Sequence, residues 1–150
     1  MNNLDSNIIY FPKEQIREIH QKTIEYSGGG STEIIDLGKL EAVIEHIQND
    51  DYYPTFVDKI THLFFSICKF HAFVDGNKRL AITLSLNFLL INSYLFATKN
   101  FMYNTENISY HVAAGNINKE LLHEILEAII YDNWDENEEL KLKYLHAIAH

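Results

Sequence analysis

The chain of 150 residues has a single cysteine, few basic residues and no long apolar run. Cys68 has no partner for an internal disulfide, and its apolar helical setting predicts a buried structural thiol in a reducing compartment. The formal net charge of -9 argues against a broad basic surface for nucleic acid or anionic lipid. We therefore expect proteins or small molecules as partners, with no direct nucleic-acid binding.

No segment has the pattern of an export signal or a membrane anchor. Residues 1–5 have neither a basic region nor an apolar core, so we expect no secretory signal. The longest apolar stretch, residues 80–91, is interrupted by three polar residues and is shorter than the ~20 residues that cross a bilayer. These features predict a cytoplasmic protein in which this stretch is a buried helix.

Apolar residues recur at three- and four-residue steps along most of the chain, which is the pattern of amphipathic helices. Pro12 suits the first turn of a helix that three consecutive glycines end after Tyr26. The next helices are expected at residues 37–48, 56–71, 77–93, 104–114 and 118–131, and a short final helix is expected to end near His150. Strand-like alternation is limited to residues 94–97 and to the loop 49–53.

These helices predict an all-α fold, a compact bundle of about six to seven helices. The helix over residues 77–93 is apolar on nearly every side, so we expect it to be the buried central helix. With no internal repeat and no interdomain linker, residues 1–150 are expected to form a single domain. Residues 132–150 are expected to form an acidic bend followed by the short C-terminal helix.

Between Phe73 and Leu80 an acid, a glycine, an amide and two cations follow one another at the start of a helix. Gly76 lets the backbone approach an anion closely, and the first free N–H groups of the helix point at it. Lys78 and Arg79 add positive charge, and a guanidinium can bind two phosphate oxygens at once. The combination predicts a phosphate site.

Asp75 and His71 add the groups that phosphoryl transfer needs. A carboxylate is the hard oxygen ligand that Mg²⁺ prefers, and a histidine, with a reference pKa near ~6.5, can accept a proton from a hydroxyl. Each residue alone also has a structural interpretation. His71 could close a helix, residues 75–77 could form a turn with a helix cap, and residues 78–79 could be a solvated pair. Their joint occurrence favours a phosphoryl-transfer site.

The run from His71 to Arg79 resembles the signature of the Fic/Doc family, His-x-Phe-x-Asp/Glu-Gly-Asn-Gly-Arg-x-x-Arg. It matches that signature at His71, Phe73, Asp75, Gly76, Asn77 and Arg79. Lys78 stands where AMP-transferring Fic enzymes have their second glycine, and Ile82 stands where they have their second arginine. Both departures resemble the Doc branch, the toxins of Phd/Doc toxin–antitoxin modules. The resemblance covers about residues 11–130.

The resemblance implies transfer of the γ-phosphate of ATP to a hydroxyl of a protein target, which blocks translation. In Doc-like proteins the acceptor is a threonine of translation elongation factor Tu. The resemblance also assigns roles: His71 as general base, Asp75 as Mg²⁺ ligand, and Gly76, Asn77, Lys78 and Arg79 as phosphate-binding residues. A long cation at position 78 would fill space that glycine leaves for the terminal phosphates, so the nucleotide would bind in the reversed sense.

The resemblance further implies that the loop 49–53 aligns the target peptide. Many Fic proteins inhibit themselves through a Ser/Thr-x-x-x-Glu-Gly/Asn helix, and the sequence contains no such pattern. Inhibition is therefore expected from a partner. A Phd-like antitoxin, with a disordered tail that folds into a helix on a hydrophobic groove, is the implied partner.

Other functions stay open at this point. An AMP-transferring Fic enzyme is the first alternative, with Lys78 as the contrary observation. A non-catalytic binding module would keep only the fold, and the presence of His71, Asp75, Asn77 and Arg79 argues against it. A metalloenzyme is disfavoured because none of the eight histidines lies in a His-Glu-x-x-His or comparable spacing.

Overall fold

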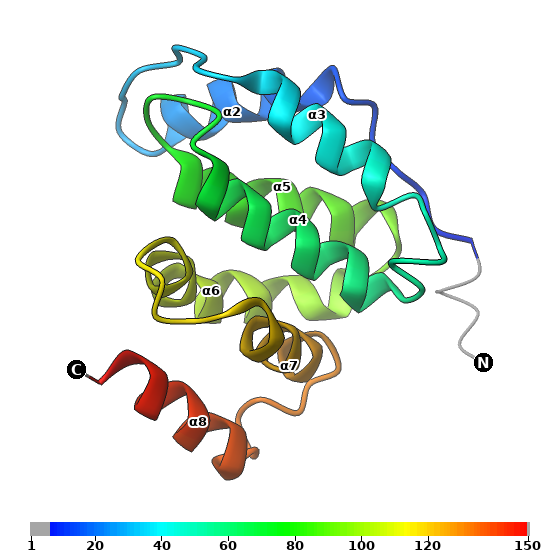
Figure 1. Ribbon diagram of the computed structural model, residues 1–150, viewed down its shortest axis with the longest axis vertical. Coiled ribbons are helices and arrows are strands. Elements are labelled where there is room, and N and C mark those ends of the chain that lie inside the picture. The colour runs from blue at the N-terminus through cyan, green and yellow to red at the C-terminus, as the bar shows by residue number, and fades with distance from the viewer. Residues whose placement is uncertain (1–6, 150) are drawn as a thin grey trace.

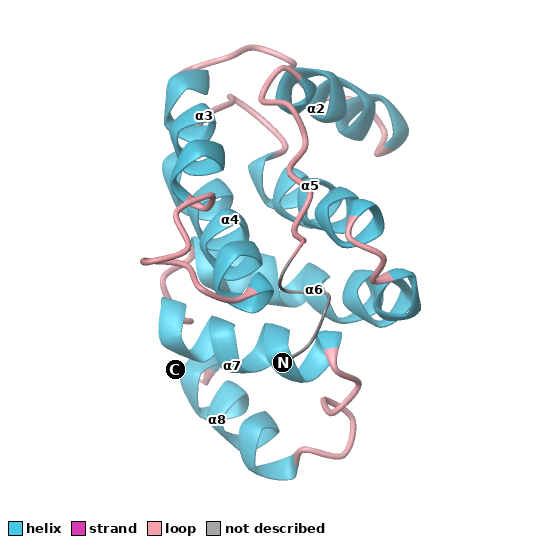
Figure 2. Ribbon diagram, turned by 90° about the vertical axis from the view of Figure 1, so that its right-hand side faces the viewer, coloured by secondary structure: helices cyan, strands magenta, loops and turns pink. Residues whose placement is uncertain are grey.

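The computed structural model describes residues 7–149, which form seven α-helices and one short 3₁₀-helix. In chain order these are α2 (Gln15–Tyr26), α3 (Leu37–His46), α4 (Phe56–Phe70), α5 (Asn77–Ile91), η1 (Leu95–Ala97), α6 (Thr98–Ala113), α7 (Lys119–Ile130) and α8 (Glu138–Ile148). Figures 1 and 2 show a helical bundle whose connections are loops. The predicted all-α fold is confirmed. Within residues 7–149, no helix has the length and apolar content needed to span a bilayer.

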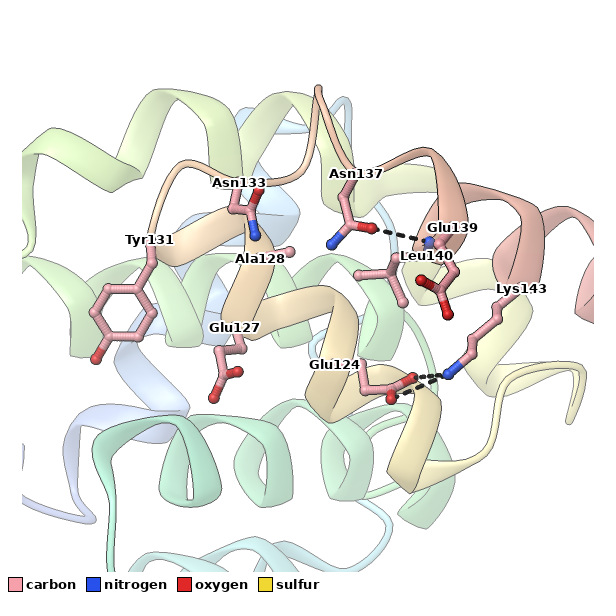
Figure 3. Close-up of a pocket in the computed structure, with 9 residues that line it drawn as sticks. All are labelled: Glu124, Glu127, Ala128, Tyr131, Asn133, Asn137, Glu139, Leu140 and Lys143. Carbon is pink, nitrogen blue, oxygen red and sulfur yellow. Dashed lines mark hydrogen bonds and ion pairs between the residues drawn. The ribbon is translucent and has the colours of Figure 1, made fainter.

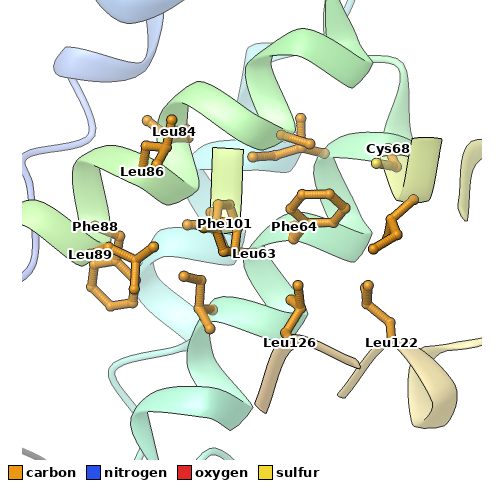
Figure 4. Packing of buried hydrophobic residues seen from close by; sticks show 14 of the residues in the cluster. Leu63, Phe64, Cys68, Leu84, Leu86, Phe88, Leu89, Phe101, Leu122 and Leu126 are labelled. Carbon is orange, nitrogen blue, oxygen red and sulfur yellow. The ribbon is translucent and has the colours of Figure 1, made fainter. Parts of the chain in front are cut away.

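Helices α4 and α5 lie at the centre of the bundle (Figure 1). α4 packs against α3, α5, α6 and α7, while α5 packs against α2, α4 and α6. Figure 4 shows one apolar cluster to which α4 to α7 contribute the labelled side chains Leu63, Phe64, Cys68, Leu84, Leu86, Phe88, Leu89, Phe101, Leu122 and Leu126. The expected burial of α5 is confirmed, and α4 shares the central position with it.

Cys68 lies in this cluster on α4 and is buried. Burial raises the pKa of its thiol to about 12. A thiol with such a pKa stays protonated and unreactive at neutral pH. The predicted structural role of Cys68 agrees with both observations.

The largest difference from the predicted elements lies between α5 and α6. Residues 94–97, whose alternation resembles a strand, form a turn that contains η1, and α6 begins at Thr98 instead of residue 104. Tyr94 is fully buried and its ring stacks on Phe56 with centroids 4.4 Å apart, so a long-range contact sets this turn. The first residues of α6 carry no apolar periodicity, which is why the sequence does not mark its start. α8 ends at Ile148, and His150 and residues 1–5 lie outside the described residues.

The C-terminal helix α8 packs against α7, and Figure 1 shows it at the end of the molecule opposite α2 and α3. A cavity of about 400 Å³ lies between α7 and α8 (Figure 3). Three of its lining residues are glutamates, and one of them, Glu124, pairs with Lys143 at 3.3 Å. This ion pair is solvent-exposed, so it contributes little to the stability of the α7–α8 contact.

A polar cluster joins the start of α7 to the first half of α4. The ammonium of Lys119 lies 2.7 Å from Nδ1 of His62, and the ring of Tyr53 stacks on the imidazole with centroids 4.7 Å apart. Because an ammonium can only donate, Nδ1 of His62 is the acceptor and carries no proton. Burial, with the neighbouring charge of Lys119 second, lowers the pKa of His62 to about 4.

This cluster predicts a pH-dependent loss of stability. Above pH 6.5 His62 is neutral in both the folded and the unfolded chain. The contribution of the neutral imidazole to the free energy of unfolding is then fully present. As the pH falls from 6.5 to about 4, only the unfolded chain takes up the proton, and the free energy of unfolding decreases. Because the group is half-buried, we expect a loss of about 1–2 kcal/mol after allowance for solvent screening.

His62→Gln keeps an acceptor for Lys119 and removes the titration. Urea unfolding of both proteins at pH 7 and pH 4.5 measures the difference, since the other titrating groups are common to the two. The variant is expected to lose less stability on acidification. Equal pH dependence in the two proteins would show that His62 does not contribute.

Candidate functional site

The motif starts where α4 ends. His71 follows Phe70 as the C-cap of α4 and adopts a left-handed conformation with φ 46° and ψ 52°. Such a residue reverses the chain direction at the end of a helix. The next two residues, Ala72 and Phe73, are buried, whereas His71 itself is exposed. The reversal therefore anchors the loop in the core and leaves the imidazole in solvent.

The loop lies against the segment 33–36, which connects the glycine-rich stretch to α3. Val74 N donates to Glu33 O at 3.0 Å, and Ala72 O accepts from Ile35 N and Asp36 N at 2.8 and 3.0 Å. The loop 49–53, which is expected to align the target peptide, precedes α4 and lies about 22 Å away along this 15-residue helix. Its role in aligning the peptide stays a prediction. Three glycines, Gly28 to Gly30, all at positive φ, instead bring the segment 33–36 back across the loop.

Asn77 fixes the shape of the loop. Its side chain is 9% exposed, accepts a hydrogen bond from Phe73 N at 3.2 Å and donates one to Phe73 O at 2.8 Å. The amide thus satisfies both backbone groups of Phe73, which would otherwise be buried without partners. The side chain of Asn77 is occupied within the loop, which leaves its backbone N–H as the group that can reach a ligand.

The N-terminus of α5 has no side-chain cap. Its N-cap is Gly76. α2, α3 and α6 also lack a side-chain cap, whereas the side chains of Thr55, Asn118 and Asn137 cap α4, α7 and α8. Gly76 has φ 79°, and a Cβ there would lie 2.7 Å from Cδ1 of Ile24, so conformation and space both require glycine. The uncapped N–H groups and the positive end of the helix dipole make this end of α5 suited to an anion.

Asp75 and Arg79 both lie close to Gly30 and hydrogen-bond the two serines that flank the glycines. Oδ2 of Asp75 accepts a hydrogen bond from Ser31 N at 2.9 Å, and Nη1 of Arg79 donates one to Oγ of Ser27. A Cβ on Gly30 would lie 3.6 Å from Oδ2 of Asp75 and 3.7 Å from Nη2 of Arg79. Both are ordinary van der Waals distances, so a Cβ would fit, and the positive φ of 133° is what favours glycine at this position.

His20 of α2 is a buried residue of this site that the sequence analysis missed. Its Nε2 lies 2.7 Å from Asp75 O, and its ring stacks on Phe73 with centroids 3.6 Å apart. Burial is the main cause that lowers the pKa of the imidazole. The sequence holds one signal for this residue, which is a polar side chain midway between Ile16 and Ile24 on the buried face of α2.

The structure brings together Asp75, Gly76 and Arg79, and both His71 and Lys78 are exposed. Among residues 7–149, no group of three or more His, Cys, Asp or Glu side chains could hold a metal ion by itself. Mg²⁺ bound with a polyphosphate needs only one or two protein carboxylates. Oδ1 of Asp75 accepts no hydrogen bond within the described range, so this carboxylate fits a metal that arrives with a nucleotide.

Comparison with known proteins agrees with the geometry. The model of the Fic/DOC family matches residues 10–89, more than half of the chain and including the whole motif. Toxin Doc of Mycolicibacterium smegmatis (strain ATCC 700084 / mc(2)155) is 35% identical over 89 residues, which cover 57% of this chain and 68% of that toxin. No solved structure gives a significant match. The chain belongs to the Fic/DOC family.

Proposed function

We propose that this protein is a cytoplasmic, Doc-like toxin kinase that transfers the γ-phosphate of ATP to a hydroxyl of a protein target and so blocks translation. A threonine of elongation factor Tu is the expected acceptor. The observation that best supports transfer chemistry is the uncapped N-terminus of α5 with Asp75 and Arg79 beside it. The similarity to a toxin named Doc supports the biological role.

Phosphate binding rests on backbone N–H groups and two cations. The N–H groups of the first turn of α5 face no side-chain cap, and Lys78 and Arg79 lie in that same turn. A phosphate would replace the hydroxyl of Ser27 as the partner of Arg79. This exchange is favourable because a guanidinium binds an anionic oxygen more strongly than a neutral hydroxyl.

Asp75 is the residue that would hold Mg²⁺, which when bound would neutralise charge on the phosphates. The N–H of Ser31 orients one carboxylate oxygen of Asp75 and leaves the other for the metal. His71, exposed at the end of α4, is the residue that we expect to accept the proton of the incoming hydroxyl. The segment 33–36, which hydrogen-bonds the loop, would in this proposal border a bound target peptide.

Labelled ATP tests the proposed reaction directly. Elongation factor Tu is incubated with the protein, Mg²⁺ and ATP labelled on either the α- or the γ-phosphate, and its intact mass is measured. Incorporation of the γ-label with a gain of one phosphate is the expected result. Incorporation of the α-label would identify an AMP transferase, and no modification of this or any other protein in a cell extract would favour a binding module.

Asp75→Asn is expected to weaken the dependence on Mg²⁺ and the transfer rate together. The amide keeps an oxygen for the N–H of Ser31 but loses the negative charge that the metal requires. Initial rates over a series of Mg²⁺ concentrations measure the effect. Asp135→Asn, an exposed change in the connection between α7 and α8, serves as the matched control. An unchanged Mg²⁺ titration in Asp75→Asn would exclude its role as ligand.

A groove beside Arg79 fits the proposed Phd-like antitoxin. It has a volume of about 450 Å³, lies between α2, α5 and α6, and its walls include Ile19, Tyr26, Arg79, Ile82, Met102 and Glu106. A helix with an apolar face would cover these side chains and, at the same time, the guanidinium that the phosphates need. Binding there would therefore inhibit transfer.

Met102→Glu tests this groove. Met102 is 58% exposed, so the variant should fold and stay toxic, while a charge in the groove should prevent neutralisation by a co-expressed Phd-type antitoxin. Leu142→Glu makes the same type of change at a residue of α8 that is 57% exposed. Growth rescue of Leu142→Glu but not of Met102→Glu is the expected result. Equal rescue would place the antitoxin elsewhere.

A further inference from the structure

His20 lies against the turn that connects the loop to α5. Its side chain is 0% exposed, and its ring is nearly parallel to that of Phe73, at 10°. Its Nε2 lies 2.7 Å from Asp75 O, and a Cβ on Gly76 would lie 3.4 Å from the same nitrogen. One imidazole therefore lies against Phe73, Asp75 and Gly76 within four residues of the chain.

The hydrogen bond determines which nitrogen of His20 carries the proton. A carbonyl oxygen can only accept, so Nε2 is the donor, and in a neutral ring Nδ1 then has a bare lone pair. Within residues 7–149, Nδ1 is buried without a hydrogen-bond partner. His20 is therefore a fixed donor to Asp75 O.

We infer that His20 is a positioning residue for the proposed transfer, which orients the peptide between Asp75 and Gly76 through its Nε2–H. That peptide joins the proposed metal ligand to the N-cap of α5. Its orientation sets both the direction of the Asp75 carboxylate and the direction of the first N–H groups of the helix. This inference rests on the proposed function, because it assigns those two groups to Mg²⁺ and phosphate.

Two variants separate the donor from the ring. His20→Phe keeps a flat ring on Phe73 and removes the donor, whereas His20→Gln removes the ring and places an N–H at the distance of Nε2. In His20→Phe we expect the half-saturating Mg²⁺·ATP concentration to rise roughly tenfold, because small displacements in a site reduce its function strongly. The amide resonances of Gly76 and Asn77 should shift as well. His20→Gln should restore both values toward those of the wild type.

A purely structural role predicts a different result. Asn92→Leu removes another buried side chain that hydrogen-bonds the backbone. Asn92 lies at the C-terminal end of α5, and its amide donates to Ile9 O and Phe88 O. It should lower the melting temperature and leave Mg²⁺·ATP half-saturation and the Gly76 amide unchanged. A folded His20→Phe protein that behaves in this same way would overturn the inference. So would a folded His20→Gln protein as defective as His20→Phe.

Three measurements do not depend on activity. The ¹⁵N resonances of the wild-type imidazole report the tautomer, and a proton on Nδ1 of His20 instead of Nε2 would refute the inference even if no variant folds. Calorimetric binding of Mg²⁺·ATP and the amide shifts can be measured whether or not phosphate is transferred. If the wild type transfers nothing, the proposed function fails while the role of His20 in placing the turn is still decided.

Discussion

Replacement of His71 by alanine is expected to lower the transfer rate roughly 10²–10⁴-fold, the usual contribution of a general base. The imidazole is exposed, and no hydrogen bond to it is present among the described residues, so its removal should not weaken the core. The residue is left-handed with φ 46°, a conformation that asparagine adopts more readily than alanine. His71→Asn therefore provides a second variant that preserves the end of α4 and still lacks a base.

Transfer of label from ATP and growth arrest on expression measure the loss, and circular dichroism measures the fold. His146→Ala, at an exposed position of α8, is the matched control and should keep full activity. Both His71 variants should melt near the wild-type temperature. Full toxicity of a well-folded His71 variant would refute the assignment of this residue as the base.

Lys78→Gly is expected to abolish transfer of the γ-phosphate. Lys78 is the second residue of α5 and is exposed beside the uncapped N–H groups, where its length and charge can exclude one orientation of a nucleotide. Glycine would remove that restriction and return the motif to the pattern of AMP-transferring Fic enzymes. A gain of AMP transfer is the lesser expectation, because Ile82 replaces the second arginine that would hold the other orientation.

The control for this change is Lys99→Gly, at the second residue of α6, which is also exposed. Glycine in a helix lowers stability by roughly 0.5–1 kcal/mol at either position, so the pair separates the loss of a helix former from the loss of the cation. Mass spectrometry of the target distinguishes one phosphate from one AMP. Undiminished phosphate transfer by Lys78→Gly, or AMP transfer by the wild type, would show that Lys78 does not set the reaction.

The helices were predictable where burial on one face imposes a regular apolar spacing. α4 has such a spacing, together with a capping box at Thr55 and Asp58, and its predicted and observed ranges agree within one residue. α6 was predicted six residues too late because its first turn is polar and its start depends on the buried ring of Tyr94. The contact between this ring and Phe56 of α4 joins residues far apart in the chain, so it leaves no local sequence pattern.

The sequence by itself determined the family and the chemical groups of the motif. Neighbouring residues at the start of a helix lie together at its N-terminus through local geometry alone, so the motif could be recognised without the fold. Only the tertiary structure decided what surrounds them. Ser31, Ser27 and His20 reach Asp75 and Arg79 across 44, 52 and 55 residues of chain. No periodicity relates residues so far apart, and the packing of α2 against α5 and the path of the glycine-rich segment bring them together. The same long-range packing makes the segment 33–36, and not the loop 49–53, the neighbour of the motif.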